Sequence, residues 1–112
     1  MKINKVVVIG SGTMGSGIAA QLCNANIPVT LLDLKTEISQ KAKERIEKSR
    51  PPLLIDKSKI NGINVGNITD DFDLVSEADW IVEAVVERID IKHNIYEKIF
   101  NKRKKSSIVS SN

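Results

Sequence analysis

Three glycines near the amino terminus have the spacing of a phosphate-binding turn. Gly10, Gly12 and Gly15 follow an apolar run at residues 6–9 and precede a segment rich in small residues. A turn of this kind between a strand and a helix gathers backbone N–H groups and the positive end of the helix dipole, and both attract an anionic pyrophosphate. We expect Gly10 to permit the tight turn, Gly12 to leave room for phosphate beside the backbone, and Gly15 to let the helix pack against the strand.

The context of these glycines favours a dinucleotide. The alternative is an ordinary glycine-rich turn between a strand and a helix, and a P-loop is excluded because the motif lacks a Gly-Lys-Ser/Thr ending. Asp33 ends the next apolar run, 21 residues after Gly12, close to the roughly 20-residue offset of an acid that binds the adenosine ribose. Its carboxylate can accept both ribose hydroxyls, and its charge would repel the 2′-phosphate of NADP. We therefore expect NAD; Lys35 is a nearby cation that would weaken this discrimination unless it is solvated.

The apolar periodicity indicates the elements that must position these residues. β-branched and aliphatic runs predict buried strands, whereas apolar residues three or four positions apart predict helices, as with the stripe of Met14, Ile18 and Leu22. The segment 53–67 is the least regular, and we expect a short helical turn there before a brief strand near Ile68. The further elements predicted are a strand at 28–33, a helix at 36–48 ended by Pro51-Pro52, a short helical turn before the fourth strand, a strand at 80–85, a helix at 89–100 and a strand at 107–111.

This alternation predicts an α/β fold, a Rossmann-like doubly wound parallel sheet with right-handed crossovers. In such sheets a ligand binds beyond the carboxyl ends of the strands, at the switch point between the first and fourth strands. Residues 84–88 and Asn112 fall there. Lys92 falls in the first turn of its helix, where a bound anion would offset the unfavourable dipole; a solvated lysine is the alternative. We expect His93 to be inert and Trp80 to be a packing residue.

Length and composition restrict the class of protein. The 112 residues form one domain, 1–112, too short for a complete six-stranded dinucleotide fold with a substrate domain. We therefore expect the sheet to be truncated after the fifth strand. A net charge of +3 and four aromatic residues argue against a nucleic-acid partner. The basic run 102–105 falls at a predicted helix end, where solvated cations complement the dipole.

Cysteine and hydropathy patterns bear on the compartment. The single cysteine, Cys23, cannot form an internal disulfide and is expected to be a small buried side chain, which fits a reducing cytoplasm. No apolar stretch has the length of a signal peptide core or of a membrane span, so we expect no membrane partner. The sequence contains one histidine and one cysteine, so no cluster of metal ligands is expected.

Three segments of the chain resemble the NAD-binding domain of 3-hydroxyacyl-CoA dehydrogenases. They are the glycine motif at 8–19, Glu-Ala-Val-Val-Glu-Arg at 83–88, and Ile-Val-Ser-Ser-Asn at 108–112. The resemblance covers essentially the whole chain. Segments 51–54 and 66–72 are similar to larger members that carry this domain ahead of further dehydrogenase and enoyl-CoA hydratase regions and act in fatty-acid β-oxidation.

The resemblance implies a role for each residue that matches the motifs. It places the pyrophosphate on the glycine turn, the adenosine ribose on Asp33 and the nicotinamide half of the cofactor near residues 84–87. The implied cofactor-binding set is Gly10, Gly12, Thr13, Met14, Gly15, Asp33, Ala84, Val85, Glu87, Lys92 and Asn112.

The catalytic residues of the family cannot be mapped onto this chain. In the family a Thr-Ser pair follows the asparagine matched by Asn112, and a later histidine held by a glutamate acts as general acid and base; His93 does not match it. Such proton transfer contributes about 10²–10⁴ in rate, so we expect no dehydrogenase activity from this chain alone. An acyl-CoA would bind only if a C-terminal region completes the site. The alternatives are a non-catalytic NAD-binding module and a decaying remnant.

The last predicted strand, 107–111, would form an open edge of the sheet. Its backbone groups are then free to pair with another strand. We expect self-association or capture of a complementing chain at this edge.

Overall fold

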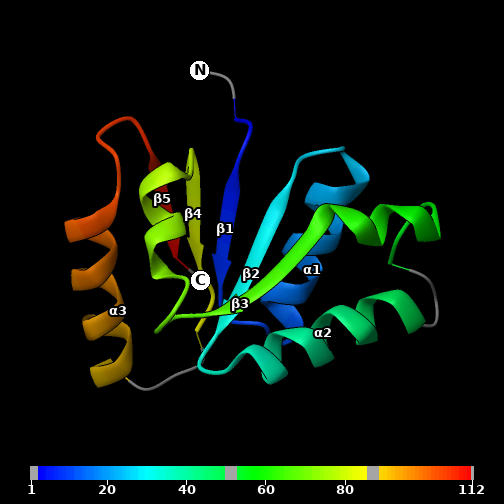
Figure 1. Cartoon of the computed structure of the whole chain (residues 1–112), viewed down its shortest axis with the longest axis horizontal. Helices are drawn as coiled ribbons and strands as arrows, with labels where there is room; N and C mark the ends of the chain where they lie inside the picture. Colours follow the sequence, from blue (N-terminus) through cyan, green and yellow to red (C-terminus); the bar gives the residue numbers. More distant parts are fainter. Residues whose placement is uncertain (1–2, 50–52, 86–88, 112) are drawn as a thin grey trace.

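The strands and helices alternate along the chain, as the apolar pattern predicts. The computed structural model describes residues 3–49, 53–85 and 89–111, except for the side chains of residues 57 and 89–93. The elements shown in Figure 1 are β1 Val6–Ile9, α1 Thr13–Asn24, β2 Val29–Asp33, α2 Thr36–Lys48, η1 Lys57–Gly62, β3 Ile63–Asn67, η2 Phe72–Glu77, β4 Trp80–Glu83, α3 Ile89–Lys102 and β5 Ile108–Ser111, where η1 and η2 are 3₁₀ helices.

The five strands form one parallel sheet in the order β3-β2-β1-β4-β5. In its centre Val6 pairs with Val29 of β2 and with Trp80 of β4. The order reverses between β1 and β4, which creates the switch point expected of a doubly wound sheet. Helices α1 and α2 cover one face of the sheet, and α3 and η2 cover the other (Figure 1). The predicted α/β, Rossmann-like fold class is confirmed.

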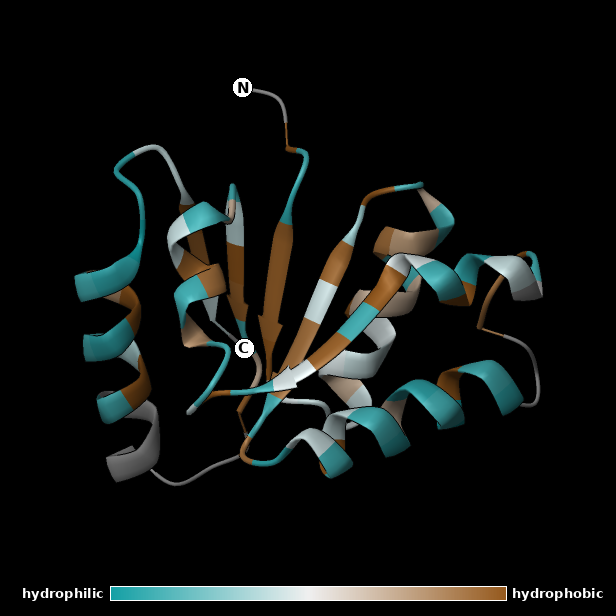
Figure 2. Cartoon of the chain, viewed as in Figure 1, coloured by the Kyte–Doolittle hydropathy of each residue, from teal (hydrophilic) through white to brown (hydrophobic). Residues whose placement is uncertain are grey.

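The core consists of two apolar layers, one on each face of the sheet. Alternate residues of β1 point to opposite faces, so Val8 packs with α1 and α2 while Val7 packs with α3 and η2. Figure 2 shows the central strands as almost continuously hydrophobic, and α3 as hydrophobic on the side that faces the sheet. Ile95 and Ile99 supply that side of α3 and are buried. Continuous apolar strands therefore result from burial on both faces.

Two strand boundaries differ from the sequence prediction by more than one residue. The third strand is not centred near Ile68 but ends at Asn67, because the Asn67 side chain accepts hydrogen bonds from the N–H groups of Thr69 and Asp70 and forms a turn. The fourth strand ends at Glu83 rather than at residue 85. The expected helical turns before β3 and β4 are present as η1 and η2.

Two predictions about helices also need correction. Met14 does not share a buried stripe with Leu22, because 59% of Met14 is exposed at the start of α1. Helix α3 continues to Lys102, two residues beyond the predicted end.

Cys23 is buried, as predicted, and burial raises the pKa of its thiol. None of the described helices has the length and the apolar character needed to cross a bilayer.

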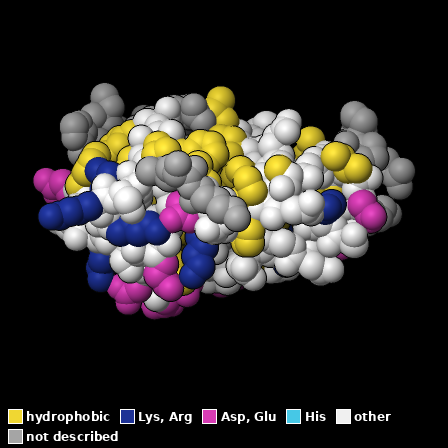
Figure 3. Space-filling view, turned by 90° about the horizontal axis from the view of Figure 1, so that it is seen from above, with side chains coloured by type: hydrophobic (Ala, Val, Ile, Leu, Met, Phe, Trp, Pro, Cys, Tyr) yellow, Lys and Arg dark blue, Asp and Glu magenta, His cyan; other side chains and the backbone are white. Residues whose placement is uncertain are grey.

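Two lysines of the basic run at the end of α3 are paired with acidic residues rather than simply solvated. Lys102 Nζ donates to Asp73 Oδ1 of η2 at 2.6 Å, and Lys104 donates to Asp79 just before β4. Asp79 also accepts hydrogen bonds from the N–H groups of Asn4 and Lys5. The Lys104 ammonium and these two N–H groups lower the pKa of Asp79 to about 2. Seen from the amino ends of the strands, acidic and basic side chains gather at the α3 and η2 end of the molecule (Figure 3).

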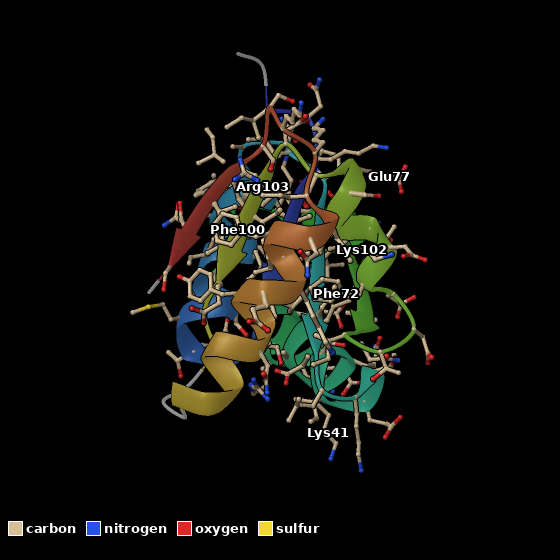
Figure 4. The ribbon with its side chains drawn as sticks, turned by 90° about the vertical axis from the view of Figure 1, so that its left-hand side faces the viewer. Lys41, Phe72, Glu77, Phe100, Lys102 and Arg103 are labelled. Atoms are coloured by element: carbon tan, nitrogen blue, oxygen red, sulfur yellow. The ribbon has the colours of Figure 1, made fainter. Side chains whose placement is uncertain are left out.

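The outer side of α3 carries an exposed aromatic ring beside the last strand. Tyr96 and Phe100 stack with their ring centroids 6.2 Å apart, and the guanidinium of Arg103 lies 5.4 Å from the centroid of Phe100. Phe100 is 55% exposed. In Figure 4, Phe100 and Arg103 lie on the side of α3 toward β5, whereas Lys102 lies on the side toward η2.

Candidate cofactor site

The turn after β1 and the start of α1 pack so closely that only glycine fits at one position in each. Gly10 has φ +106°, and a Cβ there would lie 2.6 Å from the backbone oxygen of Ala84. A Cβ on Gly15 would lie 1.8 Å from the backbone oxygen of Gly10. The expected roles of Gly10 in the turn and of Gly15 in helix packing are therefore confirmed. The approach of phosphate to Gly12 stays a prediction.

The amino end of α1 is suited to an anion. Its N-cap residue is Gly12, which supplies no side-chain cap, and the first turn of the helix contains no acidic residue. No side chain of the first turn therefore accepts a hydrogen bond from the first N–H groups of α1 or places a negative charge at the positive end of its dipole. Thr13 and Met14 are exposed at this end.

The carboxylate of Asp33 is directed at the glycine turn. Its Oδ2 accepts hydrogen bonds from both the N–H (2.8 Å) and the hydroxyl of Ser11, and its Oδ1 accepts from the N–H of Leu34 at 2.7 Å. A carboxylate has about four acceptor positions, so three are in use. Binding of both ribose hydroxyls stays a prediction, and it requires the Ser11 hydroxyl to turn away from Asp33.

Sequence reasoning missed the role of Ser11 in this site. Ser11 is 1% exposed, and its carbonyl oxygen accepts from Ser16 Oγ at 2.9 Å and from Arg45 Nη2 at 3.0 Å. The position of Ser11 between two glycines of the motif was a signal in the sequence that could have indicated this role. The contact with Arg45 joins residues 34 positions apart, so no local pattern could reveal it.

The predicted residues converge on a cavity of about 180 Å³ at the switch point. Gly10, Gly12 and Asp33 lie on its β1 and β2 side, and Ala84 and Val85 face them from the segment after β4. The complete lining is Ile9, Gly10, Ser11, Gly12, Asp33, Leu34, Ile68, Ala84, Val85 and Ile95. Such apolar walls with one carboxylate are typical of a pocket for an aromatic ring and an attached hydroxylated sugar.

The remaining predicted site residues stand outside this lining. Thr13, Met14 and Gly15 lie in the first turn of α1, next to the glycine turn. Glu87 and Asn112 lie outside the described residues. The backbone of Lys92 is in the first turn of α3, but its side chain, like that of His93, is outside the described part.

A buried glutamate shapes the β4 side of the cavity. Glu83 has no exposed surface, and its Oε2 accepts from the N–H of Val85 at 2.6 Å while its Oε1 accepts from the hydroxyl of Ser111 at 2.9 Å. One carboxylate thus fixes the segment that lines the cavity and ties it to the end of β5. Among the described residues, no group of three or more His, Cys, Asp or Glu side chains could hold a metal ion.

A parallel sheet with this order, a glycine turn at its switch point and an acid at the end of β2 define a dinucleotide-binding domain of the Rossmann class. Residues 5–112 match the sequence model of the 3-hydroxyacyl-CoA dehydrogenase NAD-binding domain. The chain therefore belongs to the 3-hydroxyacyl-CoA dehydrogenase family, in which this domain binds NAD, as the sequence resemblance implied.

Relatives with this domain are considerably longer than the present chain. A probable 3-hydroxyacyl-CoA dehydrogenase of Deinococcus radiodurans is 43% identical over all of this chain, which spans 34% of that protein. A Rickettsia felis protein, named as a candidate trifunctional enzyme of a fatty acid oxidation complex, is 42% identical over 99% of this chain and 16% of its own length. The solved structure of (S)-3-hydroxybutyryl-CoA dehydrogenase from Ralstonia eutropha is 25% identical, with a TM-score of 0.79, over 99% of this chain and 41% of that one.

Proposed function

We propose that this chain supplies the NAD(H)-binding part of an enzyme that oxidises 3-hydroxyacyl-CoA or reduces 3-oxoacyl-CoA in fatty-acid β-oxidation. The observation that carries the proposal is the cavity at the switch point, where the glycine turn and Asp33 face Ala84 and Val85. The names of the relatives support the reaction class. Because the chain spans about a third or less of those curated relatives, the activity of a whole enzyme is part of the proposal.

The residues of the cavity fit a dinucleotide. The absence of side chains at Gly10 and Gly15 lets the turn pack against Ala84 and the start of α1 pack against the turn. The uncapped start of α1 offers N–H groups to a pyrophosphate. Asp33 provides the acceptor for a ribose hydroxyl, and the apolar walls exclude water from an aromatic ring. When bound, NAD supplies the ring that accepts or returns a hydride.

We propose that the proton of the substrate hydroxyl is transferred by a residue outside these cofactor motifs. Among the side chains of the binding set that the structure describes, only Asp33 is titratable, and it already accepts hydrogen bonds from Ser11. The proposed binding set is the one implied by the family motifs, including Glu87, Lys92 and Asn112. A chain with cofactor binding but no such proton donor would be inactive alone.

Calorimetric titration of the 112-residue chain with NADH tests this function. We expect saturable binding, weaker binding of NADPH, and about a tenfold loss of NADH affinity in Asp33→Asn with a smaller loss for NADPH, because the change removes the charge that repels a 2′-phosphate. The matched control is Asp73→Asn, which neutralises a carboxylate outside this cavity and should bind NADH like the wild type. A folded chain that does not bind NADH would instead favour the remnant interpretation.

Binding alone does not separate a dehydrogenase part from a non-catalytic module. The separating measurement is NADH oxidation with acetoacetyl-CoA after the chain is mixed with the complementary C-terminal part of the Deinococcus radiodurans relative. We expect activity only in the mixture. Wild-type NADH binding without activity in any such mixture would favour the non-catalytic module.

We further propose that β5 mediates self-association of the isolated 112-residue chain. The N–H of Ile108 donates to the backbone oxygen of Asp79, so the N–H and C=O of Val109 point to the opposite side, toward the open edge. An antiparallel pair of β5 strands centred on Val109 would be self-complementary, as a two-fold interface requires.

The substitution Val109→Pro tests this edge. It removes the outward N–H without removing a hydrogen bond to β4, and proline is tolerated at such edge positions. We expect a concentration-dependent dimer for the wild type and a folded monomer for the variant by light scattering. A wild type that remains monomeric at millimolar concentration would refute the proposal.

A further inference from the structure

Two helices hold the carbonyl oxygen of Ser11 in the glycine turn. Ser16 Oγ donates from α1 at 2.9 Å, and Arg45 Nη2 donates from α2 at 3.0 Å. A carbonyl oxygen has two lone pairs, so both of its acceptor positions are filled. Ser11 is 1% exposed and Ser16 is 6% exposed, and the oxygen therefore points into the protein.

This arrangement determines the direction of the next N–H group. The peptide bond between Ser11 and Gly12 is planar and trans, so its C=O and its N–H point in opposite directions. Because the Ser11 oxygen points inward, the N–H of Gly12 points outward, and Gly12 lines the cavity. The other side of Ser11 is held as well, since its N–H and its hydroxyl both donate to Asp33.

We propose that Arg45 is a positioning residue for the cofactor, because it holds the Ser11–Gly12 peptide so that the N–H of Gly12 faces the pyrophosphate. This inference rests on the proposed NAD-binding function. Arg45 contacts the turn through a charged donor, and a charged donor on a carbonyl also polarises the peptide and strengthens its N–H as a donor. The residue therefore acts on the ligand through the peptide.

Different results are expected if Arg45 only stabilises its own helix, α2, through the helix dipole. Basic residues near the carboxyl end of a helix interact favourably with its dipole, and Arg45 and Lys48 both stand in the last turn of α2. Lys48 is also exposed, so Lys48→Gln removes the same charge from the same helix. It is the matched control for Arg45→Gln.

The experiment compares ADP, which contains a pyrophosphate, with adenosine, which does not. For Arg45→Gln we expect the Kd of ADP to rise about tenfold, equivalent to about 1.4 kcal/mol, while the Kd of adenosine changes less than twofold. Lys48→Gln should change neither Kd more than twofold. Equal losses for ADP and adenosine in Arg45→Gln would overturn the proposal, because a general structural defect would weaken both.

A measurement without ligand keeps this inference separate from the proposed function. In the free protein the amide resonance of Gly12 should shift in Arg45→Gln and stay in place in Lys48→Gln, because, of these two side chains, it is Arg45 that donates to the Ser11 carbonyl. If the wild type binds neither ADP nor NADH, the NAD proposal fails, while the Gly12 resonance still reports on positioning. If the wild type binds ADP and Arg45→Gln binds it equally well, or the Gly12 resonance is unchanged, the role of Arg45 is refuted.

Discussion

Substitution of Gly15 by alanine should lower stability by an amount that the structure sets. The new Cβ would lie 1.8 Å from the backbone oxygen of Gly10, whereas ordinary contact begins at 3.4 Å. Helix α1 would therefore have to move by about 1.6 Å. The oxygen belongs to a backbone that is itself packed against Ala84, so it cannot move aside. We expect a cost of about 3 kcal/mol, at the upper end of the range for overpacking.

The measurement is urea unfolding followed by the fluorescence of Trp80, the single tryptophan of the chain. With a slope of about 1.5 kcal/mol per molar urea, Gly15→Ala should lower the unfolding midpoint by about 2 M. Most domains of this size have about 5 kcal/mol or more of stability, so the variant should still fold. It should also lose NADH affinity, because the glycine turn moves with the helix.

Gly17 provides the matched control, two residues further along α1 from the turn. A Cβ there has no neighbouring atom within 4 Å, so Gly17→Ala gains helix propensity without a clash. We expect it to raise stability by about 0.5–1 kcal/mol, which is the opposite sign. Equal midpoints for the two variants would refute the reasoning that contact with the Gly10 oxygen decides the outcome.

Three further predictions concern the turn, the core and the charged pairs. Gly10→Ala should be strongly destabilising and abolish NADH binding, since its φ is +106° and the Cβ would meet the oxygen of Ala84; wild-type NADH titration of the variant would contradict this. Ile99→Ala should cost about 2–5 kcal/mol in urea unfolding, because Ile99 of α3 is fully buried against the sheet. A loss below about 1 kcal/mol would show that the neighbouring side chains move into the cavity left by the substitution. Asp79→Asn should lower the urea midpoint at pH 7. The pKa of Asp79 is lowered from 3.8 to about 2 by Lys104 and two N–H groups, so its stabilising effect is present above about pH 4 and is lost as the pH falls through about 2. A wild-type advantage at pH 2 as large as that at pH 7 would contradict the assignment.

Much of the fold follows from local sequence, because its strongest signals are short in range. The run at 6–9, the three glycines and Asp33 predict β1, the turn and the end of β2. The third strand was displaced towards Ile68 in the prediction, whereas the actual strand, Ile63–Asn67, ends at the turn that Asn67 makes with its own side chain. The contribution of Asn67 depends on hydrogen bonding, which hydropathy does not measure.

The site was predicted less completely than the fold. Half of the cavity lining was named from spacing and resemblance, namely Gly10, Gly12, Asp33, Ala84 and Val85, but Ser11 and the polar contacts that hold the cavity were not. Arg45 reaches Ser11 only because α2 packs against α1, and this packing is a tertiary result. Glu83 stood within a recognised motif, yet its burial and its bond to Ser111 depend on the pairing of β4 with β5.

The ion pairs around Asp79 have a consequence for how this domain can change over evolution. They lie at the amino ends of the strands, whereas the cavity lies at the carboxyl ends, so the sheet separates the two regions by the length of its strands. Substitutions that adjust stability at the amino ends therefore leave the geometry around Gly10 and Asp33 intact. A lineage could adapt to heat or acidity at one end of the sheet while selection on the cofactor acts independently at the other, and laboratory stabilisation of the domain should begin at the amino ends.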